Sequence, residues 1–303
     1  MYTASIDIGT NSVLLLIAEQ TELGLQVHEE VQRLPRLGAM VDSNGVLARQ
    51  SIDRVLEVLK EYAEIIQTYG DGVLKKTRVT ATSAVRDAAN KNEFLSLVKE
   101  IVGFEIQILS GEEEAKYTYL GAISQTKVES NSILVVDIGG GSTELAMGDS
   151  SQWLGGISVD MGCVRFNERY LLHNPPYQEE IGECRYSIEV LLESTKLRLP
   201  PNTQVVAVSG TATSLAAIDQ QLFPYQLTRI NNYRLNTDKL AKSIEIFSLH
   251  TYEQLIELHP EVMKGRADVF LAGLLILEGV LRYASVKEFI VSSGGIRHGI
   301  LLS

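Results

Sequence analysis

Residues 133–147 read ILVVDIGGGSTELAM, and this stretch decides the fold. Apolar residues lead to Asp137, three glycines follow Ile138, and a second apolar run begins after Glu144. Apolar runs on both sides of a glycine turn predict two strands joined by a tight hairpin. Glycines let backbone N–H groups converge on one point, as phosphate oxygens require. Carboxylates on both sides of the loop could hold Mg²⁺ (or Mn²⁺) there, so the stretch predicts a metal–phosphate site, with a plain turn as the alternative.

The same pattern occurs a second time in the chain. Residues 6–18, IDIGTNSVLLLIA, align without gaps with residues 136–148, VDIGGGSTELAMG. The alignment places Asp7 on Asp137. Such self-similarity predicts two halves of like design that face each other across a cleft. Two phosphate-binding hairpins at one cleft are the plan of the actin-like (ribonuclease H-like) phosphotransferase fold, which this chain resembles.

The composition is that of a globular protein with two hydrophobic cores. A chain of 303 residues is about twice the usual size of one domain, and we expect an N-terminal domain over 1–128 and a C-terminal domain over 129–303. The net charge of −11 argues against nucleic-acid and anionic-membrane partners. We find no export signal and only two cysteines, so we expect a cytoplasmic protein.

Strands alternate with helices along the chain, which predicts an α/β architecture. We expect strands over 3–8, 13–19, 25–31, 77–82, 104–109, 153–160, 204–208 and 286–292, in addition to the two strands of the hairpin within 133–147. We expect helices over 52–69, 91–102, 163–172, 178–198, 237–258 and 265–284, a further helix that follows Ser110 and carries the acidic run 112–114, and a short terminal helix that packs back on the first domain. Asn90 and Glu93 form a capping-box pattern at the start of the second helix.

The run SGEEEA at 110–115 starts a helix with three acidic residues. With Ser110 as the N-cap, Glu113 occupies the third helical position and completes a capping box. Glu114 points to another side of the helix and is free for another task. An ionised carboxylate beside a phosphate site can accept a proton from water. The alternative is an acidic residue in water, stabilised by the helix dipole.

Two arginines and one small-residue turn are further candidates for anion binding. Arg86 is expected in a loop just after a strand, where functional residues often lie, and Arg36 in a polar loop. A guanidinium matches phosphate oxygens in shape. The alternative for each arginine is a surface ion pair. The turn Ser209-Gly210-Thr211 follows a strand and predicts helix-start N–H groups at a cleft, although an ordinary strand-to-helix turn would look the same.

Taken together, these motifs resemble the exopolyphosphatase and guanosine pentaphosphate phosphatase family, in its short, two-domain form. The matching motifs are IDIGTNS at 6–12, RLG at 36–38, ATSAVRDAAN at 81–90, SGEEEA at 110–115, VDIGGGSTEL at 136–145, MGCVRF at 161–166, SGTATSLAA at 209–217, RADVFLAGLLIL at 266–277 and GGIRHG at 294–299. They occur in order from end to end. The chain departs from the family pattern at Leu14, Asn174 and His298.

The resemblance implies a role for each matching residue. It implies that Glu114 is the general base and that Asp137, Glu144 and Asp7 hold the divalent metal, Mg²⁺ or Mn²⁺. The residues implied to bind phosphate are Gly9, Thr10, Asn11, Ser12, Arg36, Arg86, Gly139, Gly140, Gly141, Ser142, Thr143 and Gly210.

The resemblance implies a phosphohydrolase that releases terminal phosphate from inorganic polyphosphate or guanosine pentaphosphate. An ATP-dependent kinase of the same fold is one alternative. A catalytically silent protein that binds a nucleotide or polyphosphate is another. A homodimer is a further expectation.

Overall fold

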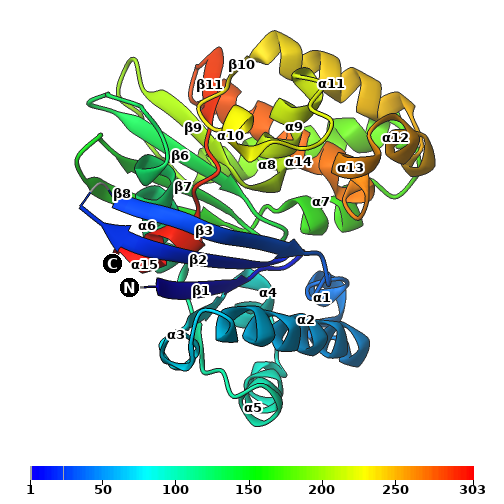
Figure 1. Cartoon of the computed structure of the whole chain (residues 1–303). Coiled ribbons are helices and arrows are strands. Elements are labelled where there is room, and N and C mark those ends of the chain that lie inside the picture. The colour runs from blue at the N-terminus through cyan, green and yellow to red at the C-terminus, as the bar shows by residue number, and fades with distance from the viewer. Residues whose placement is uncertain (1, 23) are drawn as a thin grey trace.

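The computed structural model describes residues 2–22 and 24–303, and it contains two mixed sheets with helices on their faces (Figure 1). The first sheet has the strand order β3-β2-β1-β4-β5. Its strands are β1 (Tyr2–Ile8), β2 (Val13–Thr21), β3 (Gly24–Arg33), β4 (Arg78–Ala81) and β5 (Ile106–Ile108). The second sheet has the order β10-β11-β9-β6-β7-β8. Its strands are β6 (Ile133–Ile138), β7 (Thr143–Gly148), β8 (Trp153–Val159), β9 (Gln204–Val208), β10 (Arg234–Asn236) and β11 (Glu288–Val291).

The two sheets repeat one design. In each, three antiparallel strands are followed by two strands that run parallel to the first, and only β10 has no counterpart. The hairpin registers also agree, since Ile8 pairs with Val13 and Ile138 pairs with Thr143. The predicted α/β class and the two actin-like halves are therefore confirmed. The strand β10 was not predicted.

The helices form layers outside and between the sheets (Figure 1). Outside the first sheet are α2 (Arg49–Gln67) and α5 (Lys91–Ile101), and against the second sheet are α8 (Gln178–Ser194), α9 (Ser209–Asp219), α11 (Thr237–Leu249) and α14 (Ala267–Tyr283). Between the sheets, α6 (Gly111–Ser124) packs on β6, β7 and β8, and α15 (Ile296–Leu302) packs on β1 and β2. The remaining short helices are α1 (Val41–Asn44), α3 (Asp71–Lys75), α4 (Ser83–Asp87), α7 (Cys163–Tyr170), α10 (Leu227–Ile230), α12 (Tyr252–Leu258) and α13 (Pro260–Met263).

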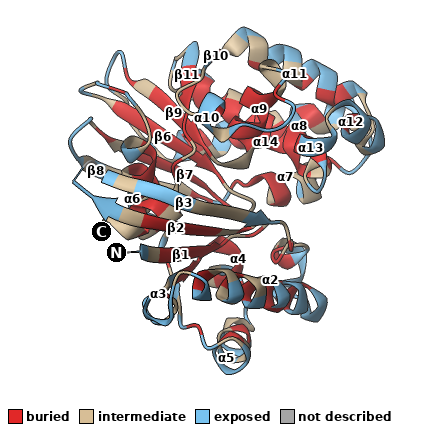
Figure 2. Ribbon diagram, viewed as in Figure 1, coloured by how far each residue is buried: buried red, intermediate tan, exposed pale blue. Residues whose placement is uncertain are grey.

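The strand β6 explains why residues 133–138 are almost wholly apolar. Side chains alternate between the faces of a strand, and both faces of β6 are buried (Figure 2). Leu134 and Val136 join the core on the α14 side, whereas Ile133 and Val135 join the core on the α6 side. By the same alternation Asp137 lies on the α6 side, at the end of the strand. The only acidic residue of β6 therefore faces the helix that carries Glu114.

Between the sheets, α6 and α15 touch through their backbones. A Cβ added at Gly121 would lie 2.0 Å from the carbonyl oxygen of Gly295, and one added at Gly299 would lie 1.9 Å from that of Tyr117. Only glycine allows this close approach. The domain division near residue 128 stays a prediction, because α6 precedes it in the chain and packs on the second sheet.

The structure confirms one predicted helix start and corrects three other predictions. The capping box of Ser110 and Glu113 at the start of α6 is confirmed. The box predicted at Asn90 is wrong, because the Asn90 side chain bonds both backbone groups of Leu47 instead. The predicted helix over 237–258 is two helices, because Thr251 begins a new capping box. Arg86 belongs to the short helix α4 and not to a loop.

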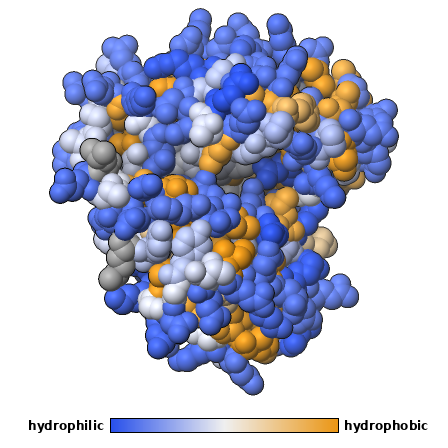
Figure 3. Space-filling model, in the orientation of Figure 1, coloured by the Kyte–Doolittle hydropathy of each residue, from blue (hydrophilic) through white to orange (hydrophobic). Residues whose placement is uncertain are grey.

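The molecular face in Figure 3 is mainly hydrophilic, with scattered apolar side chains. Among the described residues, no helix has the length and apolar character needed to cross a bilayer.

Candidate active site

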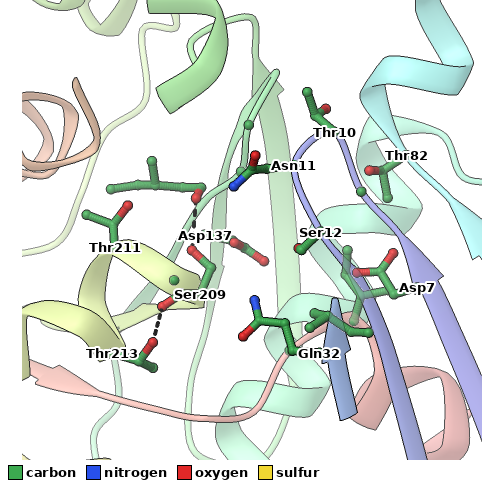
Figure 4. Close-up of a pocket in the computed structure, with 18 of the residues that line it drawn as sticks. Asp7, Thr10, Asn11, Ser12, Gln32, Thr82, Asp137, Ser209, Thr211 and Thr213 are labelled. Atoms are coloured by element: carbon green, nitrogen blue, oxygen red, sulfur yellow. Dashed lines mark hydrogen bonds between the residues drawn. The ribbon is translucent and has the colours of Figure 1, made fainter. Parts of the chain in front are cut away.

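A cavity of about 600 Å³ lies between the two halves, and both hairpin loops line it. The predicted site residues that line this cavity are Asp7, Gly9, Thr10, Asn11, Ser12, Glu114, Asp137, Gly139, Gly140, Gly141, Ser142, Glu144 and Gly210. Figure 4 shows side chains of the first loop opposite Asp137, Thr211 and Thr213 of the second half. Of the predicted residues, Arg36, Arg86 and Thr143 do not line it. The two copies of the sequence repeat therefore form two similar sides of one site.

The two hairpin loops have the same internal hydrogen bond. Gly9 N donates to Ser12 O over 2.8 Å, and Gly139 N donates to Ser142 O over 2.9 Å. Within the described residues, the N–H groups of the three positions that follow each of these glycines, 10–12 and 140–142, donate to no protein acceptor. Each loop, which lines the cavity, therefore has three backbone donors that the described protein atoms leave free for a ligand. Such a group of donors suits an anion.

Neighbouring segments hold the carbonyl groups of the loops. At the start of α7, Cys163 N donates to Gly139 O and Val164 N donates to Gly140 O, each over 2.9 Å. In the first half, Gly38 N donates to Thr10 O over 2.8 Å. These bonds fix the peptide planes of both loops through their carbonyls, so the N–H groups remain available. They explain why the motifs RLG and MGCVRF accompany the loops.

The loops also pack directly on one another. A Cβ added at Gly140 would lie 2.7 Å from Thr10 Cβ, and one added at Gly141 would lie 2.3 Å from Ser83 Oγ. Thr10 in turn approaches Gly38, where an added Cβ would lie 2.2 Å from Thr10 Cγ2. Larger residues at these glycines would separate the two sets of donors.

Glu114 enters the cavity from the first turn of α6. The capping box fixes the register of this turn, so Glu113 stays near the surface while Glu114 is only 4% exposed. Arg86 Nη1 donates to Glu114 Oε2 over 2.7 Å. Burial raises the pKa of Glu114 to about 7, although the contact with Arg86 acts to lower it. A carboxyl group with this pKa can exchange a proton near neutral pH.

Asp137 and Glu144 are directly opposite each other in the β6–β7 hairpin. Thr118 Oγ1 donates to Asp137 Oδ2 over 3.2 Å, and the hydroxyl groups of Ser142 and Ser158 donate to Glu144 Oε1 over 2.8 and 2.7 Å. Burial raises the pKa of Asp137 and raises the pKa of Glu144 well above its ordinary value, in the latter case with help from nearby carboxylates. Burial therefore disfavours the ionised form of both carboxyl groups unless a cation is bound beside them.

Asp7 is the counterpart of Asp137 in the first hairpin. Burial, followed by the charges of Glu114 and Asp137, raises the pKa of Asp7 to about 8. Its Oδ1 atom is buried and has no hydrogen-bond partner in the part of the chain that the structure describes. Leu14 occupies the position opposite Asp7 that corresponds to Glu144 in the second hairpin. The two halves are therefore alike in their loops but unlike in their carboxylates.

The charged lining of the cavity suits a divalent cation. Its described residues include the carboxylates of Asp7, Glu30, Glu114, Asp137 and Glu144 and, as cations, only Arg266 and Arg297. Among residues 2–22 and 24–303, no three His, Cys, Asp or Glu side chains are gathered as a complete metal site. Mg²⁺ commonly uses one or two carboxylates together with water and substrate phosphates. The unpartnered oxygen of Asp7 and the facing pair of Asp137 and Glu144 fit that kind of binding.

The two cavity arginines were not among the predicted site residues. Arg266 Nη1 donates to Gly210 O over 3.1 Å and to Ser214 Oγ over 2.8 Å, within the first two turns of α9. Arg297 Nη2 donates to Glu30 Oε1 over 2.9 Å. Both belong to motifs that mark the family resemblance, RADV and GGIR. Their positions in these motifs were the only feature of the sequence that could have marked them as site residues.

The three predicted residues outside the lining make contacts elsewhere. Arg86 contacts Glu114, as described above. Arg36 pairs with Asp268 of α14 across the two halves. The Thr143 hydroxyl donates to the carbonyl oxygen of Met161 and so helps to fix the end of the glycine loop.

Comparisons with known proteins agree with this description. The model of the Ppx/GppA phosphatase family matches residues 16–303. Exopolyphosphatase 2 of Mycobacterium tuberculosis is 32% identical, with 99% of this chain and 97% of that protein covered. The crystal structure of the Aquifex aeolicus member of the Ppx/GppA family is 32% identical with a TM-score of 0.83, over 100% of this chain and 96% of that one. An exopolyphosphatase structure from Cytophaga hutchinsonii, 24% identical with a TM-score of 0.89 over 100% and 97% of the two chains, shows the same fold.

Proposed function

We propose that this chain, which belongs to the Ppx/GppA phosphatase family, hydrolyses the terminal phosphate from inorganic polyphosphate or guanosine pentaphosphate. The observation that carries this proposal is the meeting of two sets of free backbone donors with the buried carboxylate Glu114 in one cavity. The donors suit the phosphate group, and the carboxylate suits the attacking water. A binding protein would need the donors but not Glu114.

The chain's own donors orient and stabilise the terminal phosphate. The N–H groups at 10–12 and 140–142 are held before substrate arrives, so they need no rearrangement as negative charge develops on the phosphate oxygens. Arg266 and Arg297 add positive charge at the cavity wall. Because phosphoryl transfer depends largely on positioning and electrostatics, these groups supply much of the catalysis.

Glu114 acts as the general base in this proposal. A pKa of about 7 allows it to be ionised in a large fraction of the molecules at neutral pH and still accept a proton. The contact with Arg86 fixes the carboxylate and leaves its second oxygen to orient water. Arg86 is then a residue that positions the base, in addition to the phosphate contact implied by the family resemblance.

Asp137, Glu144 and Asp7 are the carboxylates proposed to supply one or two ligands to Mg²⁺, with Mn²⁺ as the alternative, while water and phosphate oxygens would supply the other ligands. When bound, the cation would neutralise charge on the phosphate oxygens and on these buried carboxylates. The hydroxyl groups of Ser142 and Ser158 would keep Glu144 oriented toward the cavity.

Part of the cavity wall is apolar. The apolar residues that line it include Leu14, Val31, Leu34, Leu227, Val269 and Phe270. An apolar wall can accept a nucleobase, which guanosine pentaphosphate has and polyphosphate lacks. This favours including the nucleotide among the tested substrates. A homodimer and a cytoplasmic location remain predictions.

The test is to incubate the purified chain with Mg²⁺ and, in separate reactions, long-chain polyphosphate, guanosine pentaphosphate and ATP, and to measure released phosphate. We expect release from at least one of the first two. A preparation of Glu114→Gln, treated identically, controls for contaminating phosphatases. No release from either substrate by folded protein, with Mg²⁺ or with Mn²⁺, would contradict the proposed function.

A further inference from the structure

Arg165 of α7 binds three partners around the glycine loop, yet it lies outside the lining of the cavity. Its Nε donates to Gly141 O over 2.7 Å and its Nη2 to Asp87 Oδ2 over 2.9 Å. Its Nη1 donates to Asp42 Oδ1. Asp42 and Asp87 belong to the first half of the chain, whereas Gly141 and Arg165 belong to the second. One guanidinium therefore joins the two halves and the loop.

A second set of contacts continues from Arg165 to Glu114. Asp87, which Arg165 binds through Oδ2, lies 3.9 Å from the Nε of Arg86 through Oδ1. Arg86 then donates to Glu114 Oε2 over 2.7 Å. Alternating positive and negative groups thus connect the glycine loop with the proposed base, Gly141–Arg165–Asp87–Arg86–Glu114. The position of each charge depends on its neighbours.

These contacts lie on the side of the molecule opposite the α6–α15 contact. In Figure 1, α1 and α7 approach each other at the right of the view, while α6 and α15 lie together at the left. Arg169, one turn after Arg165, also binds Asp42, with Nη2 to Oδ1 at 2.6 Å. The Arg165 and Asp42 side chains are only 13% and 14% exposed, so solvent and salt screen this pair less than an ion pair at the surface. The two halves are thus joined on both sides of the cavity.

We propose that Arg165 is a positioning residue, which holds the Gly141 peptide and the Arg86–Glu114 pair in alignment across the cleft. This inference rests on the proposed function, because it concerns the same site. Charge-assisted hydrogen bonds from one planar guanidinium fix both distance and direction, and lysine cannot reproduce them. Small displacements of catalytic groups reduce rates strongly.

The first test is a double-mutant cycle with Arg165→Ala and Asp87→Asn. We expect Arg165→Ala to lower kcat by about 10–100-fold and to change KM less, because Arg165 does not line the cavity. The double variant should lose less kcat than the product of the two single losses, since the two residues share one contact. Losses that multiply would contradict the connection through Asp87, and parent-like kcat in Arg165→Ala would overturn the proposal.

Arg185→Ala is the matched control. Arg185 also binds a carboxylate through two nitrogens, to Glu278 at 2.7 and 3.2 Å, but within the second half and away from the cavity. It should lose an ion pair and retain parent kcat. An equal loss of kcat in both variants would show a general effect of destabilisation and would overturn the positioning role.

A measurement that does not depend on catalysis tests the role of Arg165 independently of the proposed function. Amide hydrogen exchange at Gly139, which bonds Ser142 O, and in the paired strand segment 143–145 should be faster in Arg165→Ala than in the parent or Arg185→Ala, because the loop loses a fixed carbonyl. If the parent releases no phosphate, the proposed function fails, and the exchange result still tests the hold on the loop. If Arg165→Ala does not fold, Asp42→Asn replaces it. This variant should also speed exchange, and unchanged exchange would overturn the proposal.

Discussion

Arg86 Nη1 donates a hydrogen bond to Glu114 Oε2 over 2.7 Å, and the two side chains come from different helices. From the sequence, Arg86 was a candidate for gripping phosphate and Glu114 was a candidate for the base. The structure makes them one unit, in which the arginine offsets part of the cost of burying the carboxylate. Changes at Arg86 should therefore alter the acid–base behaviour of Glu114.

The first prediction is a pH dependence that Arg86 controls. As a base, Glu114 must lose its proton, so kcat/KM should rise with pH through about 7. Arg86 acts to lower the pKa of Glu114, so Arg86→Ala should raise this pKa and move the rising limb to higher pH. Initial rates measured from pH 5 to 9 check this. If the rising limb of kcat/KM stays at the same pH in Arg86→Ala, Arg86 does not control the pKa of Glu114. Its role would then be phosphate binding alone, and the substitution would only increase KM.

The second prediction concerns the metal. Glu144→Gln keeps the shape of the side chain and can still accept from Ser142 and Ser158, but it removes one negative charge from the proposed cation site. We expect the Mg²⁺ concentration for half-maximal activity to rise at least about 10-fold, since carboxylates are preferred ligands of this ion. Titration of activity with Mg²⁺ measures this concentration.

Glu278→Gln is the control for that titration, because Glu278 pairs with Arg185 away from the cavity. Its metal dependence should match that of the parent. If Glu144→Gln also matches the parent, Glu144 does not hold the metal.

Local sequence rules predicted much of the fold because they describe local interactions. The repeated Asp-Ile-Gly hairpins and the cap of α6 depend on neighbours in the chain, and both are present as expected. Asn90 shows where such rules fail. Its side chain satisfies the backbone of Leu47, a residue far away in sequence, and no local pattern reveals that partner.

The site was predicted less completely for the same reason. The loops and the acidic residues have recognisable local patterns, and the structure gathers them in one cavity. Arg266 and Arg297 reach the cavity only through the packing of α14 and α15, which spacing alone does not predict. Arg36 was predicted to bind phosphate but lies outside the cavity lining. It pairs instead with Asp268, which lies in the other half of the chain.

The third prediction is that metal-free protein becomes less stable as pH rises. The pKa of Asp7 is about 8 in the folded state and 3.8 as its ordinary value. The stabilisation from its proton is therefore complete below pH 3.8 and is lost as pH rises through about 8. Asp7→Asn removes this titration, so its Tm should exceed that of the parent by more at pH 8 than at pH 5. Thermal unfolding with a chelator present measures the difference.

Asp137 and Glu144 have raised pKa values as well, so Asp7→Asn should reduce the slope of Tm against pH without abolishing it. Equal slopes for variant and parent would show that Asp7 is not protonated in the folded protein. Added Mg²⁺ should raise the Tm of the parent most at high pH, where the carboxylates are charged and need a cation.

The last prediction separates Glu114 from its neighbour Glu113. Both carry the same carboxylate, but Glu113 accepts from Ser110 N over 2.8 Å and completes the cap, whereas Glu114 is buried at the cavity. Glu113→Gln retains a side chain that can cap the helix, so rate and stability should change little. Glu114→Gln retains the shape but cannot accept the proton, and kcat should fall by about 10²–10⁴-fold while substrate still binds. Steady-state kinetics for kcat and a direct binding measurement for the substrate test both variants. A crippled Glu113→Gln beside a normal Glu114→Gln would show that the base has been assigned to the wrong residue of the pair.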